Sequence, residues 1–257
     1  MKKELELWEN YGPLFSFEER NVFFEDTAEL EFYRHLRGRH PGRCLELGAG
    51  DGRLAAVLSG RDITVALEPS AAMLDCWSEE DGERVARLRA TAQSIPLKMG
   101  SIDLALFPYN GLHCILDRVE RLEVLRGVSE LLAEGGVFVS ETCPQFSDRE
   151  DETDTLRYSF SKGDECLRLV ESVSHRFDDG FMGTGRIYFD MTYTGTIAPG
   201  GRTRLMLEMA LISAGEYLED LRGSGMSIMS VWGDYDMSPW DGESSPRLLV
   251  RAVRSTR

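Results

Sequence analysis

The chain has 257 residues, 44 of them acidic and 29 basic, which gives a formal net charge of −15 at pH 7. This charge argues against a nucleic-acid partner, because contacts with phosphates need a basic face. The length suits one domain with an elaboration, and the five singly placed cysteines favour reduced thiols over zinc ligands or a disulfide framework.

The first forty residues are predicted to form a helical cap. Glu4 to Glu9 opens the region, Tyr11-Gly12-Pro13 is expected to interrupt it, and Thr27 to Leu36 has apolar residues at helical spacings. The first thirty residues are too acidic for a signal peptide, and no apolar run in the chain reaches membrane-spanning length. We therefore expect a cytoplasmic protein with no membrane partner.

Between Arg43 and Ser140 the pattern alternates between strand and helix. Such alternation predicts a doubly wound, mostly parallel sheet with helices on both faces. The predicted elements are strand 43–47, helix 52–58, strand 63–67, helix 70–77, strands 85–89 and 102–107, helix 117–132 and strand 136–140.

After Pro144 the pattern changes to strand-like alternation between glycine and aspartate turns. The stretch 148–154 is acidic and is expected to be a loop, whereas 166–173, 185–194 and 202–210 are predicted to be strands of a small antiparallel sheet. A helix over 213–222 and strands over 227–233 and 247–253 would then complete the main sheet at seven strands. We expect residues 1–40 to be the cap, 41–145 and 211–257 the core, and 146–210 an inserted lid.

Three glycines at alternate positions, Gly48, Gly50 and Gly52, follow the first predicted strand. Glycines here allow a sharp turn from strand to helix and let backbone N–H groups approach a ligand closely. Glu68 lies twenty residues past the first glycine, at the end of the next strand, where a carboxylate can accept hydrogen bonds from ribose hydroxyls. The pattern indicates a nucleotide-type ligand.

The spacing separates two possible ligands. A dinucleotide turn reads Gly-x-Gly-x-x-Gly, and here the last position is Arg53. Glu46 lies two residues before Gly48 and would repel a pyrophosphate, whereas it suits a cationic ligand such as an ammonium or a sulfonium. The chain here resembles the class I S-adenosylmethionine-dependent methyltransferases.

Further segments carry this resemblance over about residues 43–143. Ile63 to Leu74 resembles the second motif of the family, and Thr91-Ala92-Gln93-Ser94-Ile95-Pro96 resembles the third, with Thr91 in place of the usual acid. Ser101 to Phe107 resembles the fourth strand, and Leu131 to Ser140 the glycine turn and fifth strand. The order of several motifs is more specific than one glycine turn.

The resemblance implies a Rossmann-like methyltransferase fold and S-adenosylmethionine as cofactor. It implies no metal. The residues implied to bind the cofactor are Glu46, Gly48, Ala49, Gly50, Glu68, Pro69, Met73, Ala92, Gln93, Phe107 and Asn110.

Methyl transfer needs the acceptor lone pair aligned with the methyl carbon, and a base only if the acceptor is protonated. Segment 108–113 follows the fourth strand, where the family places residues facing the methyl, so His113 is the candidate base. A structural role for His113 has about equal weight. Tyr11 is a second candidate, which would close over the methyl donor, with turn packing as the alternative.

We expect methyl transfer to an N or O atom of a small-molecule metabolite. Two alternatives stay open: a non-catalytic module that binds S-adenosylmethionine or S-adenosylhomocysteine, and a protein methyltransferase. The sequence identifies neither the acceptor nor the oligomeric state, a homodimer included.

Overall fold

The core of the molecule is a seven-stranded sheet. The computed structural model describes residues 2–23, 27–60, 62–77, 85–178, 184–242 and 244–255. The strands of the core sheet are β1 (Cys44–Leu47), β2 (Thr64–Leu67), β3 (Val85–Leu88), β4 (Ile102–Phe107), β5 (Leu132–Thr142), β10 (Met226–Trp232) and β11 (Leu248–Arg254). Their order is β10-β11-β5-β4-β1-β2-β3, and β1 to β5 run parallel while β11 is antiparallel to both of its neighbours. The predicted doubly wound, mostly parallel seven-stranded sheet is confirmed.

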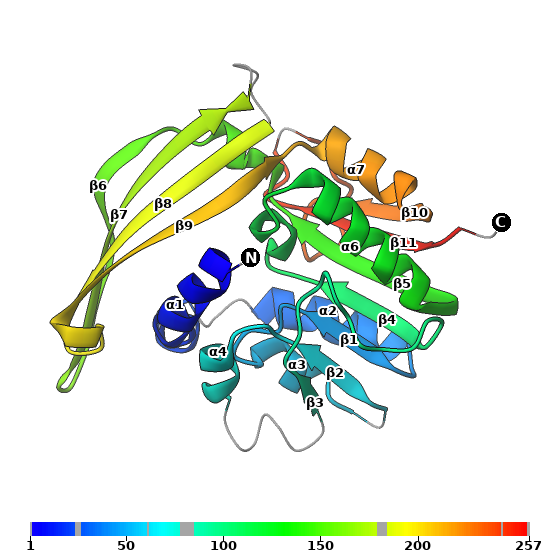
Figure 1. Ribbon diagram of the computed structural model, residues 1–257, viewed down its shortest axis with the longest axis horizontal. Helices are drawn as coiled ribbons and strands as arrows, with labels where there is room; N and C mark the ends of the chain where they lie inside the picture. Colours follow the sequence, from blue (N-terminus) through cyan, green and yellow to red (C-terminus); the bar gives the residue numbers. More distant parts are fainter. Residues whose placement is uncertain are drawn as a thin grey trace.

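Helices cover both faces of this sheet (Figure 1). They are α2 (Thr27–Arg39), α3 (Arg53–Leu58), α4 (Ala71–Asp75), α6 (Arg118–Leu131) and α7 (Ala214–Gly223), with 3₁₀ turns η1 (Gly111–Cys114), η2 (Pro144–Asp148) and η4 (Pro199–Gly201). Leu45 and Phe107 pack on the face covered by α6 and α7, whereas Leu104 and Leu106 pack on the face covered by α2 and α3. Burial of both faces explains why these strands are apolar along most of their length.

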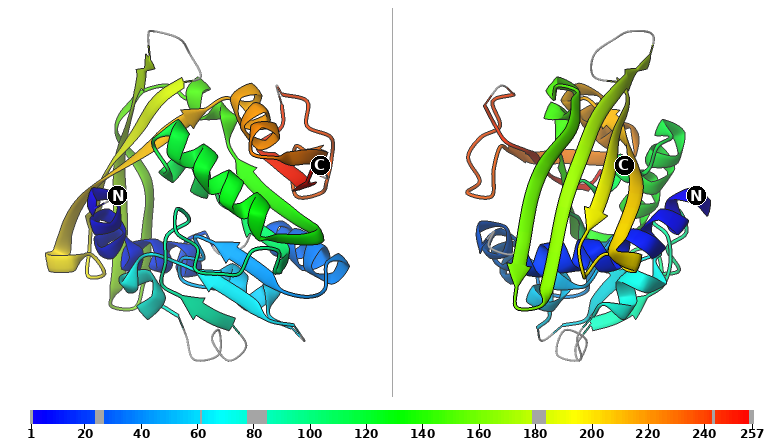
Figure 2. Two further views of the ribbon diagram at one scale, coloured as in Figure 1. Left: turned by 45° about the vertical axis from the view of Figure 1, so that its right-hand side comes forward. Right: turned by 90° about the vertical axis from the view of Figure 1, so that its left-hand side faces the viewer.

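The second sheet has four antiparallel strands in chain order, and we call it the lid after the role predicted for it. They are β6 (Glu152–Lys162), β7 (Glu165–Phe177), β8 (Thr184–Thr194) and β9 (Arg202–Ile212). The lid stands beside the core sheet, and β9 leads back into α7 (Figures 1 and 2). The three strands predicted for this region are present.

The first lid strand, β6, is where the sequence-based expectation was wrong. The stretch 148–154 was expected to be an acidic loop, but β6 begins at Glu152. Two irregularities in its pairing with β7 lie between Glu152 and Thr155 and between Leu156 and Tyr158. They break the two-residue alternation by which a strand is recognised. Arg157 forms ion pairs of 2.8 Å with Glu152 and 2.7 Å with Glu171 of β7, so Glu152 at the start of β6 has a basic partner outside the stretch.

Helix α1 (Lys2–Asn21) is continuous through the predicted interruption, which is a second correction. Pro13 is inside the helix and its side chain is exposed. Tyr11 and Leu14, by contrast, are buried against the lid, and the backbone of Gly12 fits against Met73 of α4. Packing on two sides stabilises the helix despite the hydrogen bond that proline removes. Figures 1 and 2 show α1 lying between the lid and the core.

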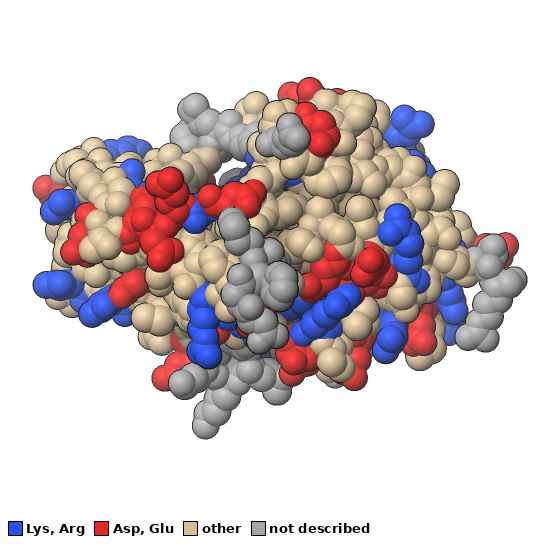
Figure 3. Space-filling model, turned by 90° about the horizontal axis from the view of Figure 1, so that it is seen from above, with Lys and Arg blue, Asp and Glu red and all other residues tan. Residues whose placement is uncertain are grey.

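The surface carries charges of both signs. On the face shown in Figure 3, acidic and basic side chains lie side by side over the lid and the core. Among the helices of the described residues, none is long and apolar enough to cross a membrane.

Candidate active site

The glycine turn connects β1 to α3, and all three of its glycines have positive φ, of 66°, 56° and 83°. A Cβ on Gly52 would lie 2.4 Å from the ring of Trp77, so this glycine is required for packing. A Cβ on Gly48 would meet only Phe107, at 3.6 Å, and one on Gly50 would have no atom of the described residues within 4 Å. The first two glycines therefore border open space, where a ligand can approach the backbone.

Glu68 follows β2 and reaches back to the glycine turn. Its two carboxylate oxygens accept hydrogen bonds from the backbone N–H groups of Gly50, at 2.9 Å, and of Ser70, at 2.8 Å. Burial raises the pKa of this carboxyl, and the two backbone hydrogen bonds oppose that rise. The carboxylate is fixed in place beside the open side of the turn, as hydrogen bonding to a ribose requires.

Glu46 is the most deeply buried acid of the turn, with 2% of its surface exposed. Its Oε2 atom has no hydrogen-bond partner among the described residues. Burial raises the pKa of this carboxyl well above its usual range, although nearby Arg53 opposes the rise. A buried carboxylate oxygen without a partner is costly, and a cationic group on a ligand would satisfy it. This oxygen, together with the open space over Gly48 and Gly50, fits the ammonium end of S-adenosylmethionine.

The turn after β4 has an unusual backbone. Tyr109 and Asn110 both adopt left-handed conformations, with φ of 52° and 60°. A Cβ on Gly111 would lie 2.2 Å from the ring of Phe107, so only glycine fits there. Strained backbone of this kind concentrates at functional sites. Asn110 Oδ1 is buried and has no hydrogen-bond partner among the described residues, which leaves it available to a ligand.

Tyr109 connects this turn to the cap and to β5. Its side chain is 48% exposed, and its hydroxyl donates to Glu19 of α1 at 2.9 Å. Its backbone N–H donates to Glu141 at the end of β5, at 3.3 Å. The ring meets Phe15 of α1 edge to face, with 5.9 Å between ring centres. The end of β4 thus presents a half-exposed tyrosine between two buried acids, Glu19 and Glu141.

Helix α1 contacts both the glycine turn and the start of α4. The Glu9 carboxylate accepts hydrogen bonds from the N–H groups of Ala71 and Ala72 at the start of α4, at 2.9 and 3.0 Å. Asp51 in the turn accepts hydrogen bonds from Ser16 and Arg20, both at 2.8 Å. The cap is therefore a wall of the site.

Two buried carboxyls near this wall have pKa values raised to about 7. Burial is the main cause for Glu18, whose carboxylate accepts hydrogen bonds from the hydroxyls of Tyr158 and Tyr193 in the lid. Burial is likewise the main cause for Glu141, whose Oε2 accepts from the hydroxyl of Tyr235 at 2.9 Å. A carboxyl with a pKa near 7 is suited to accept a proton at neutral pH.

His113, the candidate base, lies fully buried in η1. Its Nδ1 is 2.7 Å from the carbonyl oxygen of Ala210, and its Nε2 accepts from the N–H of Cys143 at 3.2 Å. Burial lowers its pKa to about 4. With both ring nitrogens in hydrogen bonds to the backbone, the imidazole has no free lone pair for an acceptor, and this geometry favours the structural reading of His113.

Tyr11 faces the lid rather than the glycine turn. Its hydroxyl is 3.4 Å from Glu18, and its ring stacks on Trp8 with 5.4 Å between ring centres. Burial raises its pKa well above the usual value. Its packing against Tyr193 of β8 makes it part of the contact between α1 and the lid. Closure of Tyr11 over the methyl donor stays a prediction.

The other residues predicted to bind the cofactor divide between the turn and a loop. Ala49 and Met73 are buried at the turn and at α4, and Pro69 directly follows Glu68. Ala92 and Gln93 follow β3 and lie in a surface hollow beside α6. Their contact with the cofactor stays a prediction.

Sequence reasoning missed four acids and one tyrosine of this region. Tyr109 could have been predicted from the sequence, because it precedes Asn110 in the segment that follows the fourth strand. The acids Glu18, Glu19, Glu29 and Glu141 carry no local signal, since each looks like an ordinary charge on a helix or a strand end. Arg53, which appeared in the sequence only as a departure from the dinucleotide spacing, holds Glu29 at 2.5 Å and Glu19 at 3.4 Å.

One protein family matches the part of the chain that carries this candidate site. The family described as "Methyltransferase domain" matches residues 44–136, which include the glycine turn, Glu68 and the turn after β4. No curated protein matches the chain in sequence.

Solved structures are similar over nearly the whole chain. An S-adenosylmethionine-dependent methyltransferase from Clostridium acetobutylicum has a TM-score of 0.74 and 13% identity, with 93% of this chain and 96% of that chain covered. The sugar N-methyltransferase KedS8 from Streptoalloteichus has a TM-score of 0.71 and 17% identity, with 94% and 93% covered. CalS10, an amino pentose methyltransferase from Micromonospora echinaspora solved with S-adenosylmethionine bound, has a TM-score of 0.65 and 17% identity, with 93% and 94% covered. At these identities the likeness establishes the fold.

Proposed function

Because residues 44–136 form a class I S-adenosylmethionine-dependent methyltransferase domain, we propose that the protein transfers a methyl group to an amine nitrogen of a small molecule. The choice of an amine as the acceptor rests on the surroundings of Tyr109. Its half-exposed ring lies between Glu19, which accepts from its hydroxyl, and Glu141, which accepts from its backbone N–H. An ammonium ion is the acceptor that neighbouring carboxylates attract most strongly.

Several residues would hold S-adenosylmethionine. Glu46 offers its unpartnered carboxylate oxygen to the ammonium group, Glu68 faces the ribose hydroxyls, and the open space over Gly48 and Gly50 accommodates the chain between them. The bound cofactor supplies a methyl group activated by its sulfonium. Phe107 and Asn110 at the end of β4 would border that methyl.

The chain's own contribution to the chemistry is binding, orientation and removal of one proton. An amine arrives at neutral pH as R–NH₃⁺, whose nitrogen has no free lone pair. The Glu141 carboxyl, with a pKa of about 7 because of burial, would take that proton within the site. The neutral amine would then have a lone pair to align with the methyl group, whose bond to sulfur breaks, with its electron pair left on sulfur, as the bond to nitrogen forms. The cap and the lid exclude water from the reacting atoms.

Two neighbours with this fold act on amino compounds by their names, KedS8 as a sugar N-methyltransferase and CalS10 as an amino pentose methyltransferase. This likeness supports a small amine as the acceptor class. The position of α1 and the lid also supports a small acceptor over a folded protein, since both lie beside the end of β4 (Figure 1).

The test uses the full chain with S-adenosylmethionine carrying a ¹³C-methyl group. Panels of small amines, small alcohols and unfolded and folded proteins are incubated separately, and labelled products are identified by mass spectrometry. Labelled small amines support the proposal, whereas label on hydroxyl compounds or on proteins contradicts it. Tight binding of S-adenosylhomocysteine without any labelled product would favour the non-catalytic binding module.

A further inference from the structure

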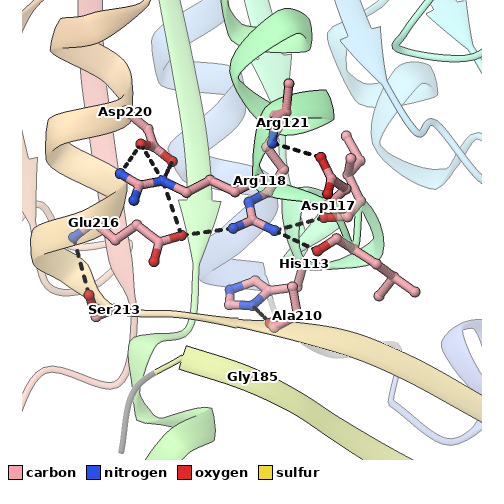
Figure 4. Close-up of polar contacts among 12 residues, drawn as sticks. His113, Asp117, Arg118, Arg121, Gly185, Ala210, Ser213, Glu216 and Asp220 are labelled. Atoms are coloured by element: carbon pink, nitrogen blue, oxygen red, sulfur yellow. Dashed lines mark hydrogen bonds and ion pairs between the residues drawn. The ribbon is translucent and has the colours of Figure 1, made fainter. Parts of the chain in front are cut away.

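His113 joins three parts of the chain that are far apart in sequence. Its Nδ1 contacts the carbonyl of Ala210, 97 residues away on β9, at 2.7 Å. Its Nε2 accepts from the N–H of Cys143, 30 residues away at the end of β5, at 3.2 Å. Figure 4 shows the imidazole directed at Ala210.

These two partners lie at the two places where the chain passes between the core and the lid. Cys143 directly follows β5, where the chain leaves the core for the lid. Ala210 lies near the end of β9, three residues before Ser213 caps α7, where the chain returns to the core. The His113 side chain therefore forms hydrogen bonds with both connections between the core and the lid.

The third part is the turn that carries Tyr109. His113 lies in η1, which begins directly after the left-handed residues Tyr109 and Asn110. Phe146 of η2 packs edge to face on the imidazole, with 5.2 Å between ring centres, and in turn contacts Phe189 of β8. The packing extends the hydrogen-bonded link into the lid sheet.

A second contact fixes the return connection. Arg121 of α6 donates to the carbonyl oxygens of Ile115 and Leu116, just after η1, and to Glu216 of α7 at 2.7 Å. Figure 4 shows this arginine between η1 and α7. The segment after Tyr109 is thus joined to the end of β9 by His113 and to α7 by Arg121.

The partners also fix the protonation of the ring. A carbonyl oxygen only accepts and a backbone N–H only donates, so Nδ1 carries the hydrogen and Nε2 has the lone pair. A proton added to Nε2 would meet the N–H of Cys143 and break that bond. Burial, which lowers the pKa of this imidazole, acts in the same direction.

We propose that His113 is a positioning residue, which locks both lid connections to the turn carrying Tyr109 and so fixes the roof of the acceptor site. This role rests on the proposed methyl transfer, because the lid roofs the acceptor only in that reaction. The imidazole itself takes no proton from the acceptor.

The first test measures the tautomer of His113 in the full chain. Histidine labelled with ¹⁵N gives long-range ¹H–¹⁵N spectra, in which a variant His113→Gln assigns the resonance. A neutral ring with hydrogen on Nδ1 from pH 6 to pH 8 is expected. Hydrogen on Nε2, or a ring that becomes charged within this range, would overturn the proposal.

The second test measures exchange of the Cys143 amide hydrogen with solvent. His113→Leu removes both hydrogen bonds and should speed this exchange at least about fivefold, whereas His113→Gln keeps an acceptor and should change it less than about twofold. His35→Leu, at an exposed position on α2, serves as the control. An unchanged exchange rate in His113→Leu would contradict the proposed positioning role of His113. If that variant fails to fold, the tautomer measurement still tests the proposal.

Binding of S-adenosylhomocysteine, measured by calorimetry, separates this proposal from the proposed function. Each His113 variant should bind it within about twofold of the wild type, because the ring contacts neither the glycine turn nor Glu68. A loss of affinity as large as that of a Glu46 variant would overturn the positioning role. A wild-type protein that fails to bind would instead contradict the proposed function, while the tautomer and exchange results would still test the lock.

Discussion

The hydroxyl of Ser16 in helix α1 donates a hydrogen bond to the Asp51 carboxylate in the glycine turn, with 2.8 Å between the oxygens. Arg20, one turn further along α1, donates to the same carboxylate oxygen at 2.8 Å and to the backbone carbonyl of Asp51 at 3.1 Å. The cap is thus attached to the segment predicted to bind the cofactor, and its docking and cofactor binding should be coupled.

The variant Ser16→Ala tests this coupling. It leaves a buried carboxylate oxygen with one partner fewer, and we expect the free energy of unfolding to fall by about 0.5–1.5 kcal/mol. Affinity for S-adenosylhomocysteine, measured by calorimetry, should fall as well, because α1 is a wall of the site. Asn10→Ala, at an exposed position on α1, is the control. An unchanged affinity in Ser16→Ala would show that the cap docks independently of the cofactor.

Glu46→Gln should change stability and binding in opposite directions. Burial raises the pKa of this carboxyl, so the unfolded chain ionises it more readily than the folded protein does. The substitution removes this difference, and the protein without cofactor should become more stable at neutral pH. It also removes the partner for the ammonium group, and we expect binding of S-adenosylhomocysteine to weaken by roughly 1–3 kcal/mol. Denaturant unfolding and calorimetry measure the two effects. Glu134→Gln, an exposed position on β5, is the matched control, and equal affinity in Glu46→Gln and wild type would refute the assignment.

The sequence was sufficient for the parts of the fold that depend on local patterns. Apolar runs such as 102–107 have to be buried on both faces, and the glycines of the turn have to adopt positive φ. Both are consequences of side chains a few residues apart. The predicted strands and the position of Glu46 followed from such patterns.

The parts that the sequence did not predict depend on distant partners. Helix α1 continues through Pro13 because Tyr11 packs against the lid and Gly12 against Met73, contacts that no local rule contains. His113 looked like a base from its place after β4, yet its partners lie 30 and 97 residues away. Acids such as Glu18 acquire a raised pKa only through burial in the folded protein.

Two glycines of the turn offer a matched pair of variants. Gly50→Ala and Gly52→Ala both place an alanine at positive φ, which costs about 1–2 kcal/mol in each case. Only the second also drives a Cβ to 2.4 Å from Trp77, so Gly52→Ala should be less stable than Gly50→Ala by roughly 1–3 kcal/mol in denaturant unfolding.

Cofactor binding should separate the same two variants. The new methyl group of Gly50→Ala projects into the open space of the turn, so affinity for S-adenosylhomocysteine should fall even though the fold has room for that group. Equal affinity in Gly50→Ala and wild type would mean that the ligand does not approach this backbone.

The pH dependence of stability should show the effect of Glu141. Burial raises its pKa to about 7, above the 4.5 expected in the unfolded chain, so between these values the folded state binds more protons than the unfolded state. The free energy of unfolding therefore decreases as pH rises from about 4.5 to 7, by roughly 1–3 kcal/mol for this group. Glu141→Gln does not titrate and should remove that part of the slope, while Glu134→Gln, at an exposed position, should keep it. Urea unfolding at several pH values measures how the free energy of unfolding changes with pH. Identical slopes in Glu141→Gln and wild type would show that the Glu141 carboxyl has an ordinary pKa and is not suited to accept a proton from an amine.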